Sequence, residues 1–246
     1  MQIRPILISA SLLIWSLAAN PPTIIHEVAI ERNAYSLIYD GLHKQPRWVH
    51  EQIFSSRIDG KADRGKYDFK EDALIPALIR ATKDDYLRSG FDRGHMCPAG
   101  DAKFSETAME ETFFLSNISP QCPQLNRGCW AQLEKHIRNL AAKHDAIHVF
   151  TGPLFLSRLE ADGKRYVKYE VIGKTEIAVP THYFKIIFNQ SNQHIESYIV
   201  PNEPIAKNTS LESFKTTLEK VERAAGFVLK NTPLSQSPEQ VPGATY

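Results

Sequence analysis

Alternating apolar and polar residues predict short β-strands along most of the chain. Residues 35–39 and 48–54 alternate on either side of the turn signal Asp40-Gly41, so they predict a hairpin. Asp162-Gly163 predicts a second hairpin turn, between 154–159 and 165–172. Further strands are expected at 146–150, 177–179, 183–188 and 195–200. Many strands with few helices among them are typical of a mixed α+β domain.

Apolar residues at helical spacing predict two helices in the middle of the chain. The first covers 107–115, and Ser105 stands where an N-cap is expected. The second covers 126–144, which contains no proline and a single glycine in its first turn. Its apolar positions are Trp130, Leu133, Ile137, Leu140 and Ala141.

A third helix is predicted near the C-terminal end. Thr209 and Glu212 have the spacing of a capping box, and Gly226 is a helix-stop signal. The apolar stripe between them is Leu211, Phe214, Leu218, Val221 and Ala225. We therefore expect one continuous helix from the capping box to the glycine.

Length and composition are those of an ordinary globular protein. The chain has 246 residues, of which 42% are hydrophobic and 23% charged. A chain of this length can bury a full core without disulfides or structural metal. The net charge of +1 lacks the strong basic excess of many nucleic-acid binders. Any positive potential used for binding must therefore be local.

The two ends of the chain differ from its middle. Arg4 precedes an apolar run that ends in small residues, which predicts an export signal over 1–19. An uncleaved N-terminal anchor and an organelle-targeting segment are the alternatives. The run is too short for an ordinary membrane span. We assign the folded domain to 20–230 and a disordered tail to 231–246, which is rich in Pro, Ser and Gln.

The three cysteines are Cys97, Cys122 and Cys129. In an exported protein two of them could pair, and Cys122 and Cys129 are closest in sequence, but spacing does not fix connectivity. The alternative is three free, partly buried thiols. No second Cys/His pair stands at zinc-ligand spacing, so a zinc site is excluded.

The run Asp92-Arg93-Gly94-His95-Met96 joins a base to a cation. A histidine can accept a proton from water near neutral pH, which hydrolysis of a phosphodiester requires. The planar guanidinium of Arg93 suits phosphate oxygens, and Gly94 would let the backbone bend close to a ligand. The alternatives are a core or surface role for His95 and an ion pair of Arg93 with Asp92 or Asp101.

Asn126, Trp130 and Glu134 stand at i, i+4 and i+8 of the second predicted helix, along one stripe. An amide oxygen and a carboxylate that holds water fit Mg²⁺, which keeps most of its own waters. The alternatives are a helix cap for Asn126 and an ion pair of Glu134 with Arg138. Arg64, in the polar loop at 55–70, is by itself a solvated charge.

Several separated motifs resemble the DNA/RNA non-specific endonuclease family, and its endonuclease G branch in particular. The resemblance extends from about Trp48 to Phe227. The matching segments are Ser89–Met96, Pro98–Gly100, Thr112–Asn117, Pro120-Gln121, Leu125-Asn126, Trp130, Leu133-Glu134, Thr151–Leu154, Asp162-Gly163, Tyr169–Gly173 and Ala178–Thr181. Their order along the chain makes the resemblance specific. It implies a ββα-metal fold, in which helices flank a mixed or antiparallel central sheet.

The resemblance also implies a division of roles within one site. His95 would be the general base, and Asn126 would be the protein ligand of one Mg²⁺, for which Mn²⁺ would substitute. Glu134 would hold a metal-bound water, with Asp92 in support of that network. Arg93 would contact the scissile phosphate, and Arg64 best matches an upstream phosphate-contacting arginine. DNA and RNA would be cut to 5′-phosphate and 3′-hydroxyl products, and the family is often homodimeric.

The chain departs from the family in two places. Cys97 stands where relatives commonly have alanine, which breaks no catalytic role. The N-terminus favours a periplasmic or secreted location over the mitochondrion. Rival functions are an inactive nucleic-acid-binding relative and a phosphodiesterase for small nucleotides. DNA or RNA preference and any protein inhibitor are not fixed by the sequence.

Overall fold

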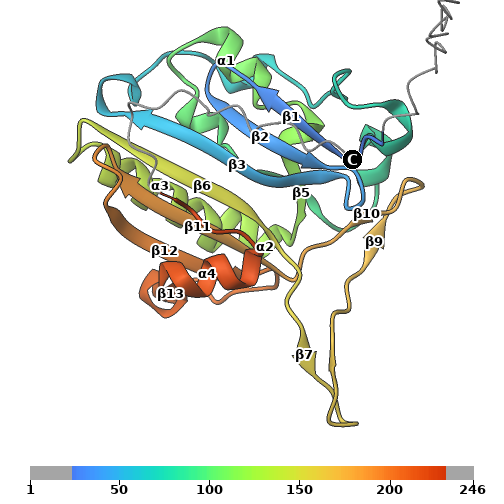
Figure 1. The fold of residues 1–246 in the computed structure, drawn as a ribbon. Helices are drawn as coiled ribbons and strands as arrows, with labels where there is room; N and C mark the ends of the chain where they lie inside the picture. Colours follow the sequence, from blue (N-terminus) through green and yellow to red (C-terminus); the bar gives the residue numbers. More distant parts are fainter. Residues whose placement is uncertain (1–23, 231–246) are drawn as a thin grey trace, which may run out of the picture.

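A computed structural model describes residues 24–230, which form one seven-stranded antiparallel sheet with helices on both faces (Figure 1). The strand order is β1-β2-β3-β6-β11-β12-β13, and every neighbouring pair is antiparallel. These strands are β1 (Glu27–Glu31), β2 (Tyr35–Asp40), β3 (Gln45–Phe54), β6 (Ala146–Leu154), β11 (His182–Asn189), β12 (His194–Pro201) and β13 (Lys215–Thr216). The predicted α+β class is confirmed, and the predicted hairpin at Asp40-Gly41 is β2–β3.

Side chains alternate between the two faces of the sheet and make a core on each. Tyr183 and Ile187 of β11 belong to the larger cluster, beneath α3 (Ala131–Ala141). Phe184 and Ile186 face the other way and pack with α4 (Leu218–Ala225). A strand buried on both faces reads as a continuous apolar run, which is why residues 183–188 lack clear alternation.

A two-stranded hairpin and a helix sit on the face that α3 covers. Strand β4 (Asp92–His95) pairs antiparallel with β5 (Ile118–Gln121), and the helix α1 (Glu106–Glu111) lies in the connection between them. Ser105 caps α1, as predicted. After β5 the chain enters α2 (Pro123–Leu125), a π-helical turn and then α3. This is the ββα arrangement that the motifs implied.

The predicted helix at 126–144 is not a single straight helix. Residues Asn126–Trp130 form a π-helical turn, with non-helical backbone at Gly128, before α3 begins at Ala131. The wider turn changes which side chains share a face. Trp130 is completely buried against Tyr183, so it is a core residue rather than a member of the site stripe.

The predicted continuous helix from Thr209 is wrong in its first half. Leu211 and Phe214 pack on the α3 face, whereas Leu218 and Val221 of α4 pack on the opposite face. One straight helix cannot reach both faces of a sheet. The chain instead forms a 3₁₀ turn and the edge strand β13, and Thr217 caps α4 by accepting a hydrogen bond from the backbone N–H of Lys220. Gly226 ends α4 at φ 73°, as predicted.

The region predicted as one long hairpin at 154–172 forms only a short one, and its last two residues pair instead with a strand that follows it. Strand β7 (Arg158–Leu159) pairs with β8 (Arg165–Tyr166), and β9 (Val171–Ile172) pairs with β10 (Ile177–Ala178). Figure 1 shows the β7–β8 hairpin projecting away from the body of the molecule. Strand β1 was not predicted, because its sequence mixes polar and apolar residues without a clean period.

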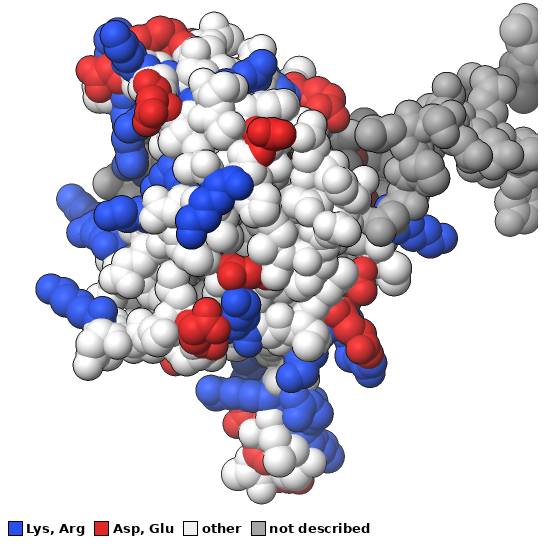
Figure 2. All heavy atoms as spheres, turned by 90° about the vertical axis from the view of Figure 1, so that its left-hand side faces the viewer, with Lys and Arg blue, Asp and Glu red and all other residues white. Residues whose placement is uncertain are grey.

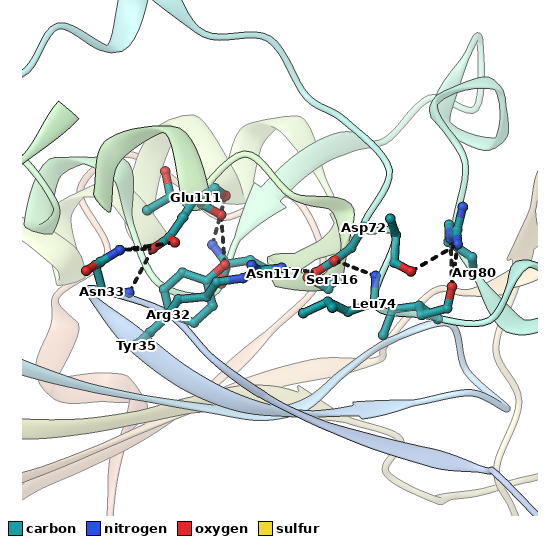
Figure 3. Close-up of polar contacts among 12 residues, drawn as sticks. Arg32, Asn33, Tyr35, Asp72, Leu74, Arg80, Glu111, Ser116 and Asn117 are labelled. Carbon is teal, nitrogen blue, oxygen red and sulfur yellow. Dashed lines mark hydrogen bonds and ion pairs between the residues drawn. The ribbon is translucent and has the colours of Figure 1, made fainter. Parts of the chain in front are cut away.

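Buried polar contacts fasten the ββα segment to the edge of the sheet (Figure 3). The carboxylate of Asp72 accepts hydrogen bonds from Arg32, at the β1–β2 turn, and from Ser116, just before β5, at 2.7 and 2.6 Å. Tyr35 of β2 donates to the carbonyl of Glu111 in α1 at 2.8 Å. These bonds join segments far apart in sequence.

The predicted export segment 1–19 and the predicted tail 231–246 lie outside the described residues. Within 24–230, no helix is both long and apolar enough to cross a membrane. Cys97, Cys122 and Cys129 are all buried and unpaired, which agrees with the alternative of three free thiols.

Candidate active site

One cleft of about 550 Å³ is lined by all six residues to which the sequence analysis assigned a catalytic or metal-binding role. These residues come from the loop before β4, from β4 itself and from the π-turn and α3. They are Arg64, Asp92, Arg93, His95, Asn126 and Glu134. The ββα segment thus brings together side chains that are far apart along the chain.

His95 ends β4 and has an unpaired ring nitrogen. The side chain lies among Phe69 and Phe113, with ring centroids at 5.3 and 5.1 Å, and only 8% of the residue is exposed. Its Nε2 has no hydrogen-bond partner in the protein. Burial, and then the positive charge of Arg64, lower the pKa of His95 to about 3. The imidazole is therefore neutral, with a nitrogen able to accept a proton.

Gly94 has a different role from the one expected. A Cβ at this position would lie 2.1 Å from Oε1 of the buried Gln121, across the β4–β5 pair. The glycine therefore makes room for Gln121 rather than for a ligand. On the other side of His95, the side chain of Asn117 bonds both the N–H and the carbonyl of Cys97 at 2.9 Å. Both contacts fix the backbone that carries His95.

Asp92 orients the side chain of Asn126. The Nδ2 of Asn126 donates to Asp92 at 2.9 Å, so its Oδ1 is left as an acceptor. Asn126 begins the π-turn, and its side chain bonds Asp92 rather than capping the N-terminus of a helix, so the N-cap alternative is not observed. Burial would raise the pKa of Asp92, but hydrogen bonds from Arg127 and then Asn126 outweigh it, and the pKa is lowered.

Glu134 is half-buried in the first turn of α3. Burial raises its pKa to about 7, against the opposing charge of Lys185. The alternative ion pair with Arg138 is not formed, because Arg138 bonds Asp101 at 2.8 Å. The carboxyl group of Glu134 therefore remains available to the cleft.

The two predicted phosphate contacts, Arg93 and Arg64, carry free positive charge. Among residues 24–230 neither forms an ion pair, so the alternative pairing of Arg93 with Asp92 or Asp101 is not observed. The guanidinium of Arg93 lies 4.5 Å from the ring centroid of Phe69, and that of Arg64 lies 5.9 Å from Phe113. Stacking of this kind holds a guanidinium in place without neutralising its charge.

The acceptors of the cleft fit a hydrated Mg²⁺ better than a fully protein-bound metal. The described residues contain no group of three or more His, Cys, Asp or Glu that could enclose a metal ion. They do offer the oriented amide oxygen of Asn126 and the Glu134 carboxyl, both lining the cleft. Mg²⁺ binds few protein oxygens and keeps several waters, as this set allows.

Sequence reasoning missed two residues of this cleft. Arg127 bonds both oxygens of Asp92, at 2.8 and 2.6 Å, and Phe69 supports both His95 and Arg93. The position of Arg127 beside Asn126 was a usable signal. No feature of the sequence around Phe69 indicated a role in the site, because Phe69 reaches the site only through the folding of the polar loop.

Comparisons with known proteins match almost the whole described chain. The family model for DNA/RNA non-specific endonuclease matches residues 18–236. Human mitochondrial endonuclease G is 45% identical over 200 residues, which are 80% of this chain and 67% of that protein. The mitochondrial nuclease of Saccharomyces cerevisiae is 40% identical over 228 residues, which are 87% of this chain and 69% of that protein. A crystal structure of an EndoG/EndoGI complex aligns with a TM-score of 0.78 at 40% identity, covering 85% of this chain and 86% of that one.

Proposed function

Because this chain belongs to the DNA/RNA non-specific endonuclease family, we propose that it hydrolyses phosphodiester bonds in both DNA and RNA with one Mg²⁺. Mn²⁺ would substitute for Mg²⁺. Cleavage without sequence preference requires contact with the sugar-phosphate backbone rather than with base edges. Arg64 and Arg93, which line the cleft, would supply such contacts.

In the proposed mechanism each side chain has a separate task. The neutral imidazole of His95 would take a proton from water, which then attacks the phosphorus. Arg93 and Arg64 bind phosphate oxygens, on which negative charge grows during attack. Asn126 would hold the Mg²⁺, and Glu134 would accept a hydrogen bond from a water in its hydration shell. When bound, Mg²⁺ would act as a Lewis acid toward the phosphate and the leaving 3′ oxygen.

The observation that carries this proposal is the arrangement of His95 and Asn126 on one cleft. A neutral histidine lines the cleft, and a neighbouring carboxylate fixes the direction of the Asn126 amide. A histidine with only a packing role would not be expected to line a polar cleft beside two unpaired arginines. The products would carry a 5′-phosphate and a 3′-hydroxyl.

Digestion of supercoiled plasmid and of RNA with Mg²⁺, with Mn²⁺ and with EDTA tests the proposal. We expect both substrates to be cut with either metal and neither to be cut in EDTA. Full activity in EDTA would refute the metal-dependent mechanism. No cleavage with either metal would indicate an inactive binding protein, and cleavage of small phosphodiesters alone would indicate a nucleotide phosphodiesterase.

A substitution at Asn126 tests the metal site directly. Asn126→Ala should weaken Mn²⁺ binding, followed by electron paramagnetic resonance, by about tenfold or more, since it removes the amide oxygen. Gln124→Ala, at an exposed position of α2, is the matched control and should bind Mn²⁺ normally. Equal affinity in the two variants would contradict the ligand role of Asn126.

We further propose that residues 1–19 direct export, although the human and yeast relatives are named as mitochondrial. The apolar run after Arg4 supports export. N-terminal sequencing of the protein from fractionated cells would distinguish a cleaved export signal, a retained anchor and a mitochondrial presequence. A homodimer is likewise proposed from the family and can be tested by analytical ultracentrifugation.

A further inference from the structure

Arg127 lines the cleft but has no task in the proposed mechanism. It follows Asn126 in the π-turn, and its side chain is 73% exposed, whereas the side chain of its partner Asp92 is 16% exposed. An ion pair that is open to solvent on one side contributes little to stability. The place of Arg127 at the mouth of the cleft is therefore better explained by binding than by folding.

The guanidinium of Arg127 is only partly used by Asp92. Its Nε donates to one carboxylate oxygen at 2.8 Å, and its Nη2 donates to the other at 2.6 Å. A guanidinium has five N–H donors, so three remain after these two bonds. Among residues 24–230 they donate to no other group. Arg127 can therefore bind a phosphate oxygen without leaving Asp92.

Asp92 holds this guanidinium in a fixed direction. Its Oδ2 accepts hydrogen bonds from Nε of Arg127 at 2.8 Å and from Nδ2 of Asn126 at 2.9 Å. One carboxylate thus positions both side chains of the π-turn. A side chain that is held in advance loses less conformational entropy when it binds a ligand.

We propose that Arg127 is a third phosphate-binding residue, which contacts the phosphate next to the scissile one. The scissile phosphate must reach His95, of which only 8% is exposed, whereas Arg127 is largely exposed. A nucleic acid strand carries one phosphate per nucleotide, so a neighbouring phosphate lies nearer to the mouth of the cleft. Arg127 thereby favours polymers over small phosphodiesters. This inference rests on the proposed function.

Substrates of different length test this role. In the unmodified protein, kcat/KM should be higher for a DNA oligonucleotide than for a dinucleotide, whose single phosphate is the scissile one. Arg127→Ala should lower kcat/KM for the oligonucleotide by about tenfold, because a hydrogen bond to a charged group is lost, and leave that for the dinucleotide unchanged. An equal loss on both substrates, or no loss on the oligonucleotide, would overturn the inference. Failure of the unmodified protein to cut the oligonucleotide would instead contradict the proposed function.

Metal binding separates a direct contact from an effect through Asp92 and Asn126. Arg127→Ala removes a positive charge beside the proposed metal ligand, so Mn²⁺ should bind as tightly as before or more tightly. Electron paramagnetic resonance measures this affinity without turnover. If Mn²⁺ affinity falls by the same factor as cleavage of the oligonucleotide, Arg127 acts only by positioning Asn126, and the proposed phosphate contact is wrong.

DNA binding provides a second readout that does not depend on cleavage. In a His95→Ala background, Arg127→Ala should weaken binding of a fluorescent oligonucleotide by about tenfold. Arg127→Lys keeps the charge without the planar fork, so it should restore only part of the affinity. Lys135→Ala, at an exposed position of α3 that does not line the cleft, is the matched control and should bind normally. An equal loss in Lys135→Ala and Arg127→Ala would show a general effect of charge and refute a specific contact.

Discussion

At the scale of single residues, burial shifts the pKa values of two groups of the site in opposite directions. It lowers the pKa of His95, which keeps the imidazole neutral, and it raises the pKa of Glu134 toward neutrality. In both cases the uncharged form is favoured, because a charge is poorly solvated in the protein. A base must be neutral to act, whereas a carboxyl group that holds a metal-bound water must be ionised. The two groups therefore respond differently to acid.

Replacement of His95 should remove the proton acceptor and leave the fold intact. We expect His95→Ala to lower kcat by about 10²–10⁴-fold at saturating Mg²⁺. Thermal unfolding and DNA binding, measured in parallel, should stay close to those of the unmodified protein. Near-normal turnover would show that another group is the base.

The pH profile should carry the signature of Glu134 rather than of His95. With a pKa near 7, Glu134 is increasingly protonated as the pH falls below 7, so kcat/KM at limiting Mg²⁺ should fall about tenfold per pH unit there. His95, with a pKa of about 3, remains neutral over that range and contributes no limb. Glu134→Gln should have low activity, and its kcat/KM should not change with pH near pH 7. A limb that persists in this variant would assign the titration to another group.

At the scale of secondary structure, the short β4–β5 pair and the π-turn set the geometry of the site. Local sequence predicted that helical residues surround Asn126 and Glu134, and both do line the cleft. The local sequence did not predict the π-turn, whose extra residue places the side chain of Trp130 in the core. The strand at β4 was also missed, because four residues are too few to show a period of two.

The start of α4 offers a test at this scale. Thr217→Ala removes a side-chain cap and should lower the free energy of unfolding by about 1 kcal/mol. Thr209→Ala should change it little, because α4 does not begin there. Chemical denaturation monitored by circular dichroism measures both variants. A larger loss at Thr209 would mean that the capping box predicted from sequence forms after all.

At the scale of the whole molecule, basic and acidic side chains are mixed over the surface rather than separated into patches of one sign. Figure 2 shows Lys and Arg interspersed with Asp and Glu over one face, with Lys and Arg side chains gathered at the base of the projecting hairpin. A net charge of +1 is therefore compatible with a cleft that contains Arg64, Arg93 and Arg127. Arg127 is neutralised in part by Asp92, so the first two dominate the local field.

Salt dependence should report on these local charges. In a His95→Ala background, which prevents cleavage, duplex DNA binding should weaken steeply as salt increases, because phosphate contacts release counterions. Adding Arg93→Ala should reduce the slope of log K against log salt by about 0.9. Adding Lys220→Ala, on α4, should leave it unchanged. Equal slopes for Arg93→Ala and its background would argue against a phosphate contact.

The amino-acid sequence predicted the fold class and most strands of the main sheet, and its resemblance to a known family singled out six side chains that line the cleft. It could do so because alternation, turn residues and the spaced motifs are local properties. Three other features became visible only in the folded chain: Gly94 accommodates Gln121, Thr217 rather than Thr209 begins a helix, and Phe69 packs against His95. Each of these features depends on contact between segments that are distant in sequence, and such contacts produce no repeating pattern of residues from which they could be predicted.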